Sequence, residues 1–263
     1  MIFASDTFVL PLPPGHRFPM AKYARLRERV SNVAASLMRI PEAATDIELG
    51  RAHDASYVDA VSRGALGELA QRRIGFPWSP AMVERSRRSA GATLAACRSA
   101  LASGLGINLA GGTHHAHRGY GEGFCVFNDA AVAARAMQSE ARARRVLVVD
   151  LDVHQGDGTG DDAYLATLVT VLPRAIDRAR PDLAIYLAGA DPYAGDRLGR
   201  LALTKGGLAD RDRLVLDRLG ALGIPVAIAM AGGYAEDVDD VVDIHATTVT
   251  LALERHRIRA VLS

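Results

Sequence analysis

The sequence predicts an α/β protein, a single domain of three layers in which helices cover both faces of a mainly parallel sheet. Short apolar segments alternate along the chain with segments of helical periodicity, which is the pattern of strand–helix repeats. The apolar segments carry no polar alternation, as is typical of strands buried on both faces. The chain has 263 residues, 49% of them apolar, which suits one domain over residues 1–263 with a large core.

Four strands are expected, each rich in β-branched or other apolar residues. They cover residues 107–110, 145–150, 182–188 and 225–230. The second strand reads RVLVVD and the fourth PVAIAM, and neither leaves a polar face for solvent. We therefore expect all four to lie inside the sheet's apolar layers.

Helices are expected between these strands, where apolar residues recur with helical spacing. They cover residues 80–101, 128–143, 161–179, 210–222 and 237–255. Asn128 is a suitable N-cap, with Asp129 near the positive end of the helix dipole. Gly223 and Pro225 are stop signals for the fourth helix.

Composition excludes several classes of protein. With 31 basic and 30 acidic residues, the net charge of +1 argues against a nucleic-acid or membrane-surface protein. Two cysteines, Cys97 and Cys125, are too few for a disulfide framework and favour a reducing compartment. No apolar run reaches the roughly 18 residues of a membrane span, and the first residues lack the features of a signal peptide. We expect a cytoplasmic protein.

Polar and small residues follow every predicted strand. The segments are GGTHHAH, DLDVHQGDG, AGAD and AGGY, in chain order. Open α/β sheets bind ligands beyond the carboxyl ends of their strands. The four segments therefore predict one active site at that edge of the sheet.

The second and third of these segments suggest a metal site. Asp150, Asp152 and His154 alternate along an extended chain and so share one face. Asp191, after the next strand, could supply a further ligand. Two carboxylates, one imidazole and an open position suit Zn²⁺, although Fe²⁺ or Co²⁺ would also fit. The competing interpretation is that these residues only cap strands and form turns.

The remaining polar residues could serve acid–base chemistry. His114 and His115 are adjacent and could face a metal-bound water together. Asp150 and Asp157 could each accept a ring N–H and fix a histidine tautomer. Tyr234, which follows two glycines, could donate a hydrogen bond to a developing oxyanion. A buried structural tyrosine is the alternative.

The chain resembles the histone deacetylase superfamily. The matching segments are GGTHHAHRGYGEGFCVFNDAAVAA, VLVVDLDVHQGDGT, YLAGADPYAGDRLG and MAGGY, with further likeness in FPMAKYARLRERV, HDASYVDAV and RRIGFPWSPAMVERS. The resemblance implies an arginase/deacetylase-like fold and a zinc-dependent amidohydrolase, closest to bacterial proteins similar to class IV deacetylases. It gives every candidate residue a role: zinc ligands Asp152, His154 and Asp191; general base His115 with neighbouring His114; carboxylate partners Asp150 and Asp157; oxyanion donor Tyr234; and a substrate channel beside Gly123 and Phe124.

One departure from the family pattern is large. The segment QGDGT, residues 155–159, is followed directly by GDDAYL, whereas family members carry several tens of residues between the two corresponding motifs. The lost strands would lie at the sheet edge beyond the Asp152 strand, so that strand becomes an exposed edge. The family's monovalent-cation sites should lose ligands, and the substrate channel should be wider and wetter.

Three functions are weighed on this basis. The first is a metal-dependent deacetylase that removes acetyl or other acyl groups from acylated lysine or a small acylated amine. The second is a catalytically impaired relative that binds metal or acyl ligand without turnover, an alternative that the deletion keeps open. The third, an arginase-type hydrolase, is disfavoured by the tandem histidines and Tyr234. The oligomeric state is not predicted.

Overall fold

The computed structural model describes residues 1–152 and 158–262 and contains one sheet of six parallel strands. The spatial order of the strands is β2-β1-β3-β6-β5-β4. Their bounds are β1 Ile2–Phe3, β2 Met38–Arg39, β3 Leu105–Asn108, β4 Val146–Asp150, β5 Leu183–Leu187 and β6 Val226–Ala229. The structure confirms the predicted α/β fold with a parallel central sheet.

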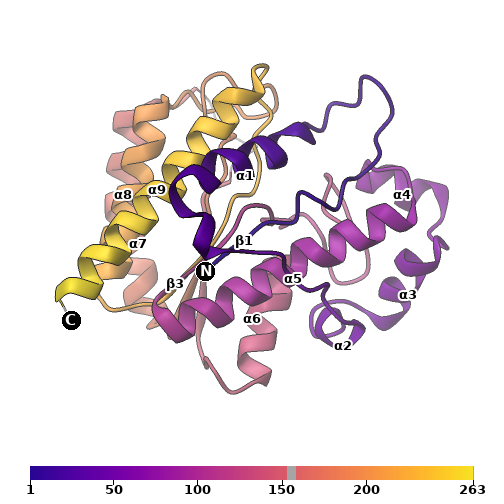
Figure 1. The fold of residues 1–263 in the computed structure, drawn as a ribbon, viewed down its shortest axis with the longest axis horizontal. Coiled ribbons are helices and arrows are strands. Elements are labelled where there is room, and N and C mark those ends of the chain that lie inside the picture. The colour runs from indigo at the N-terminus through magenta and orange to yellow at the C-terminus, as the bar shows by residue number, and fades with distance from the viewer. Residues whose placement is uncertain (153–157, 263) are drawn as a thin grey trace.

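Helices cover the two faces of this sheet, as Figure 1 shows. On one face lie α5 (Pro80–Ser103) and α6 (Asp129–Ser139); on the other lie α1 (Ala21–Ala34), α7 (Asp161–Ala179), α8 (Lys205–Ala221) and α9 (Val238–Leu262). The side chains of strand β5 point alternately to the two faces of the sheet. Leu183, Ile185 and Leu187 enter the core beneath α5 and α6, whereas Ala184 and Tyr186 enter the other. This alternation explains why the strand is apolar throughout.

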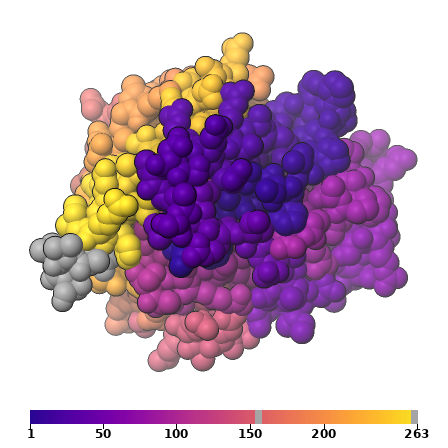
Figure 2. Space-filling model, in the orientation of Figure 1, coloured from indigo at the N-terminus to yellow at the C-terminus, as the bar shows by residue number. Residues whose placement is uncertain are grey.

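The N-terminal third contains elements that the sequence patterns did not predict. Strands β1 and β2 have two residues each, too few for a detectable pattern. Short helices follow: α2 Asp46–Leu49, α3 Ala55–Arg63 and α4 Glu68–Ile74, with the 3₁₀ turn η1 at Ala35–Leu37. Figure 2 shows α1 and the chain that precedes it lying across one face, with α1 beside α9 and the preceding chain toward the region of α3 and α4.

Strand β4 lies at the edge of the sheet in the part of the chain described. It pairs with β5 along its whole length, from Val146 with Leu183 to Asp150 with Leu187. Val148 is 40% exposed, in contrast to the fully buried residues of β5. The strands that precede Asp152 and Asp191 therefore lie side by side, with the exposed edge expected from the missing segment.

Capping residues determine where the helices begin. The Asn128 side chain accepts a hydrogen bond from the Ala131 backbone at 2.9 Å, as predicted for an N-cap. Helix α8 begins five residues before the predicted start, because Thr204 caps it through the Gly207 backbone N–H at 2.9 Å. Among the described residues, no helix has both the length and the apolar character needed to cross a membrane.

Candidate active site

Four loops meet at the carboxyl end of the sheet, as the strand-end argument predicts. The β3 loop carries His114 and His115, the β4 end carries Asp150 and Asp152, the β5 loop carries Asp191, and the β6 loop carries Tyr234. Most of these residues border a cleft with about 370 Å³ of empty space. The lining of the cleft includes His114, His115, Gly123, Phe124, Asp152 and Tyr234.

Two of the predicted metal ligands converge closely. Asp191 is fully buried and Asp152 is 8% exposed. A Cβ atom added at Gly189 would lie 2.7 Å from both Asp152 Oδ2 and Asp191 Oδ1, so these oxygens are at most twice that distance, about 5.4 Å, apart. Gly232 approaches the same pair from the β6 side, again at 2.7 Å from one oxygen of each carboxylate. Glycine at both positions leaves room for the two acids.

The β6 loop adopts an unusual backbone that aims a donor at this pair. Ala231 has φ of 57°, in the left-handed region that costs energy for a residue with a side chain. The Gly232 backbone N–H donates a hydrogen bond to Asp152 Oδ2. Gly112 packs directly on Ala231, where a Cβ atom would clash at 2.2 Å. The β3 and β6 loops are therefore held in close contact beside Asp152.

The tandem histidines form a hydrogen-bonded group with the β4 carboxylates. His114 Nδ1 lies 2.6 Å from Asp150 Oδ2, and its Nε2 lies 3.1 Å from His115 Nε2 and 3.4 Å from Asp152 Oδ1. Burial lowers the pKa of His114, but the hydrogen bond to Asp150 and the charge of Asp152 outweigh it and raise the pKa above its usual value. His114 can therefore hold a proton beside His115.

Asp129 holds the loop that carries the histidines, a role the sequence did not reveal beyond its place at a helix start. This fully buried carboxylate accepts hydrogen bonds from Gly112 N at 2.9 Å and Thr113 N at 2.8 Å. Thr93 Oγ1 donates a third at 2.6 Å. The first turn of α6 is thus fastened to the residues immediately before His114.

Tyr234 is placed by its backbone and buried by its ring. Its N–H donates to Asp196 Oδ2 at 2.5 Å, and Arg197 Nε donates to its carbonyl at 3.1 Å. The ring is 7% exposed and lies 6.0 Å from the ring of Phe124. Burial first, then neighbouring acidic groups that include Asp152, raise the pKa of Tyr234 well above its usual value. The phenol therefore stays protonated and can donate a hydrogen bond.

Gly123 and Phe124 form a tight turn on which the aromatic ring is presented. Both have positive φ, 55° and 66°. The Phe124 N–H donates to the carbonyl of Ile74, the last residue of α4, at 2.8 Å. A Cβ atom at Gly123 would come within 3.1 Å of the His115 ring, so glycine lets the turn approach the histidines.

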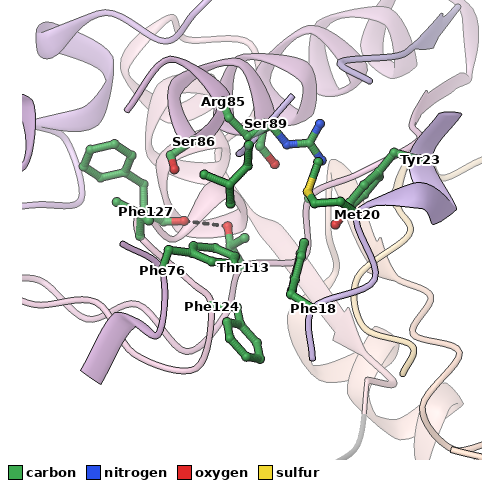
Figure 3. A pocket seen from close by; sticks show the side chains of 13 residues that line it. Phe18, Met20, Tyr23, Phe76, Arg85, Ser86, Ser89, Thr113, Phe124 and Phe127 are labelled. Carbon is green, nitrogen blue, oxygen red and sulfur yellow. Dashed lines mark hydrogen bonds between the residues drawn. The ribbon is translucent and has the colours of Figure 1, made fainter. Parts of the chain in front are cut away.

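Beside Phe124 lies a second, mainly apolar pocket that is partly open to solvent, with about 460 Å³ of space that protein atoms do not fill. Figure 3 shows the rings of Phe18, Phe76 and Phe124 around it, with Ser86, Ser89 and Arg85 on the α5 side. Phe124, Phe18, Tyr23, Gly111 and Thr113 border both this pocket and the cleft.

Several residues that border or support the site were missed from the sequence. Lys22, buried in α1, places its Nζ 3.3 Å from the Gly233 carbonyl and 5.4 Å from the Tyr234 ring centroid. His53 accepts a hydrogen bond at Nε2 from Asn128 N, so its Nδ1 carries the proton and donates to the His117 carbonyl at 2.9 Å. Both residues fall in segments, FPMAKY and HDASYV, where only the family resemblance gave a signal.

Two predicted site residues, His154 and Asp157, lie outside the described residues. Within the described ranges no group of three metal-ligating side chains is found. The donor set that is described still suits a divalent cation. Two buried carboxylates face the same small space between two glycines, and carboxylate oxygens are ligands for Zn²⁺ and Fe²⁺.

Comparison with known proteins identifies similar chains. A sequence model described as the histone deacetylase domain matches residues 16–161 and 158–250, two segments that meet at the junction after Thr159. An uncharacterized protein of Picosynechococcus is 39% identical over 280 positions, which cover 91% of this chain and 93% of that protein. Because 280 exceeds the 263 residues of the chain, the relative has additional residues inside the aligned region.

Two more distant matches are a plant protein named as a histone deacetylase and a solved structure. Histone deacetylase 2 of Arabidopsis thaliana is 28% identical over 63% of this chain, which spans 51% of that protein. The crystal structure of the HDA15 HD domain superposes with a TM-score of 0.79 and 18% identity, over 96% of this chain and 88% of that one. Because only 18% of the residues are identical, the likeness to the HDA15 HD domain shows a shared fold and no more.

Proposed function

Because the chain belongs to the histone deacetylase family, we propose that it is a metal-dependent amidohydrolase that removes acetyl or other acyl groups from acylated lysine or a small acylated amine. The observation that carries the proposal is one cleft lined by two linked histidines, a buried tyrosine and Asp152, with the buried carboxylate of Asp191 beside Asp152. Amide hydrolysis needs these functions together: an electrophilic centre, a proton carrier and an oxyanion donor.

Asp152 and Asp191 would hold the divalent ion together with His154, and Zn²⁺ suits this set best, with Fe²⁺ as the alternative. When bound, the ion supplies a Lewis acid that polarises the amide carbonyl and lowers the pKa of water. The Gly232 N–H steadies Asp152 from the β6 loop. A separate monovalent-cation site is not part of the proposal.

The histidines would move the protons. His115 takes a proton from the attacking water, and His114, whose pKa is raised, holds one for the leaving amine. The contact of 3.1 Å between the two Nε2 atoms makes the pair a single proton-carrying unit. Asp150 at 2.6 Å orients the His114 ring, and Asp157 would do the same for His115.

Tyr234 and the turn at Gly123 and Phe124 would position the substrate. The protonated phenol of Tyr234 donates to the oxygen that becomes negative in the tetrahedral intermediate. The ring of Phe124 forms one apolar wall for the alkyl chain of the acylated amine. Neither residue carries charge, which suits an uncharged amide and an aliphatic chain.

The experiment measures acetate release from an acetyl-lysine peptide and from an acetylated diamine by Zn²⁺-loaded protein. We expect Tyr234→Phe to lower kcat by about 10²–10³-fold, with a small effect on KM and the fold retained, because the ring keeps its contacts with Phe124. Tyr193→Phe, from the half-buried Tyr193 of the β5 loop, is the control and should match the wild type. Equal activity of Tyr234→Phe and wild type would contradict the proposed role.

The second candidate is a family member that binds metal or acyl ligand without turnover. It stays open because β4 is an exposed edge in the described chain and because the family match is divided into two segments, which overlap at residues 158–161. Stoichiometric metal binding without acetate release from either substrate would support this candidate over the first.

A further inference from the structure

A buried ion pair lies against the two loops that carry the candidate ligand carboxylates. Arg211 and Asp212 of α8 are 0% and 1% exposed. Asp212 Oδ1 lies 2.9 Å from Arg211 Nε and 2.8 Å from Nη2. Replacing such a pair by apolar residues is often neutral or stabilising, so stability alone is a weak reason for its presence. The proposed catalytic roles make no use of it.

The remaining contacts of Arg211 reach both loops. Its Nη1 donates to the Gly189 carbonyl at 2.6 Å and lies 3.4 Å from the Leu151 carbonyl. Leu151 is the residue before Asp152, and Gly189 is two residues before Asp191. One rigid, planar guanidinium thus bridges the β4 loop and the β5 loop at the point where their carboxylates converge.

Asp212 is also hydrogen-bonded by two hydroxyl groups. The hydroxyls of Tyr186, from β5, and Thr248, from α9, each donate to it at 2.5 Å. Burial by itself lowers the pKa of Arg211, but the charge of Asp212 outweighs it, and the guanidinium stays protonated. The guanidinium therefore contacts both Asp212 and the backbone carbonyls of the two loops, and two hydroxyls hold Asp212 in place.

We propose that Arg211 is a positioning residue for the divalent-ion site, fixing the separation of the loops that carry Asp152 and Asp191. The inference rests on the proposed function, in which these two acids hold the ion. A misplaced ligand weakens metal binding even when the ligand itself is intact, as found for residues that orient ligands at other metal sites.

The test titrates metal-free protein with Co²⁺ and measures both the Kd and the visible absorption spectrum, neither of which depends on turnover. Arg211→Lys keeps the charge and loses the fork that spans two carbonyls. We expect it to weaken Co²⁺ binding at least tenfold and to change the absorption bands. Thr248→Val is the matched control, because it removes a hydrogen bond from the same network without touching either loop. It should bind Co²⁺ within threefold of the wild type.

A folded Arg211→Lys protein with the wild-type Kd and spectrum overturns the inference. Should that variant not fold, the double variant Arg211→Met/Asp212→Asn decides, because it leaves no charge buried alone. The Asn oxygen can accept from Tyr186, and its NH2 can donate to Thr248 Oγ1, whose own proton can go to the Ile244 carbonyl. Wild-type affinity in the folded double variant likewise overturns the inference. Failure of the wild type itself to bind Co²⁺ is a different result and contradicts the proposed function.

Discussion

Replacing Asp191 by Asn should make the metal-free protein more stable while it removes the stabilisation by metal. Asp191 and Asp152 are two buried acids that share one small space, which favours a cation and penalises its absence. Asn has nearly the same shape as Asp, so the packing against Gly189 and Gly232 is preserved. The substitution therefore isolates the charge.

The size of the effect follows from the geometry. The facing oxygens of Asp152 and Asp191 are at most about 5.4 Å apart, twice their 2.7 Å distance from a Cβ position at Gly189. At an effective dielectric constant of about 20, two unit charges at that distance repel by about 3 kcal/mol. Because 5.4 Å is the largest separation that the geometry allows, Asp191→Asn relieves at least about this amount, which corresponds to a rise in Tm of at least roughly 6–12 °C for a domain of this size.

The assay is calorimetric unfolding in chelator and in Zn²⁺. Wild-type protein should gain about 2.7 kcal/mol when free Zn²⁺ is 100 times its Kd, whereas Asp191→Asn should gain much less. Asp129→Asn is the matched control, because Asp129 is an equally buried acid that is fully hydrogen-bonded by Thr93, Gly112 and Thr113. It should lower the Tm in chelator and keep the rise with Zn²⁺.

A metal-free Asp191→Asn protein that is less stable than the wild type, and that still gains stability from Zn²⁺, would refute the reasoning. Such a result would mean that Asp191 is a structural hydrogen-bond acceptor. The opposite effects expected for Asp191→Asn and Asp129→Asn in chelator make the two explanations separable.

Two further predictions concern stability and association. Val148 is 40% exposed on the edge strand β4, where pairing of two copies would bury it. Val148→Lys should therefore shift any dimer seen in sedimentation velocity toward monomer, and a dimer of unchanged stability would place the contact elsewhere. Burial lowers the pKa of His53 below 6.5, so on acidification the unfolded chain takes up the proton at a higher pH than the folded chain does. The contribution of neutral His53 to stability is therefore fully present above about pH 6.5 and is lost as the pH falls toward the folded-state pKa. His53→Gln should flatten that decline by up to about 1.4 kcal/mol per pH unit in urea unfolding, and an unchanged slope would assign the decline to other groups.

The sequence predicts the centre of the fold better than its periphery. Strands β5 and β6 are continuous apolar runs whose pattern predicts burial on both faces, and both strands are buried throughout. The same expectation of burial is wrong for β4, which lies at the sheet edge with only Val149 buried. The same pattern predicts that Asp152 and Asp191 meet, because parallel strands end at one edge. Strands β1 and β2, with two residues each, have no such pattern and depend on pairing with distant segments.

The supporting residues of the site could not be predicted for a related reason. Arg211 lies in an ordinary helical segment, and its contacts with Leu151 and Gly189 span 60 and 22 residues. Lys22 reaches Gly233 across 211 residues. Local spacing carries no information about such contacts, since they exist only once the sheet and its helices are assembled.

The central claim is that Asp152 and Asp191 hold one divalent ion beside His114 and Tyr234. Anomalous diffraction at the zinc edge, from crystals grown with Zn²⁺, measures this directly. We expect a single strong peak between the two carboxylates. Crystals in which zinc binds elsewhere, and in which no peak lies within coordination distance of either carboxylate, would contradict it.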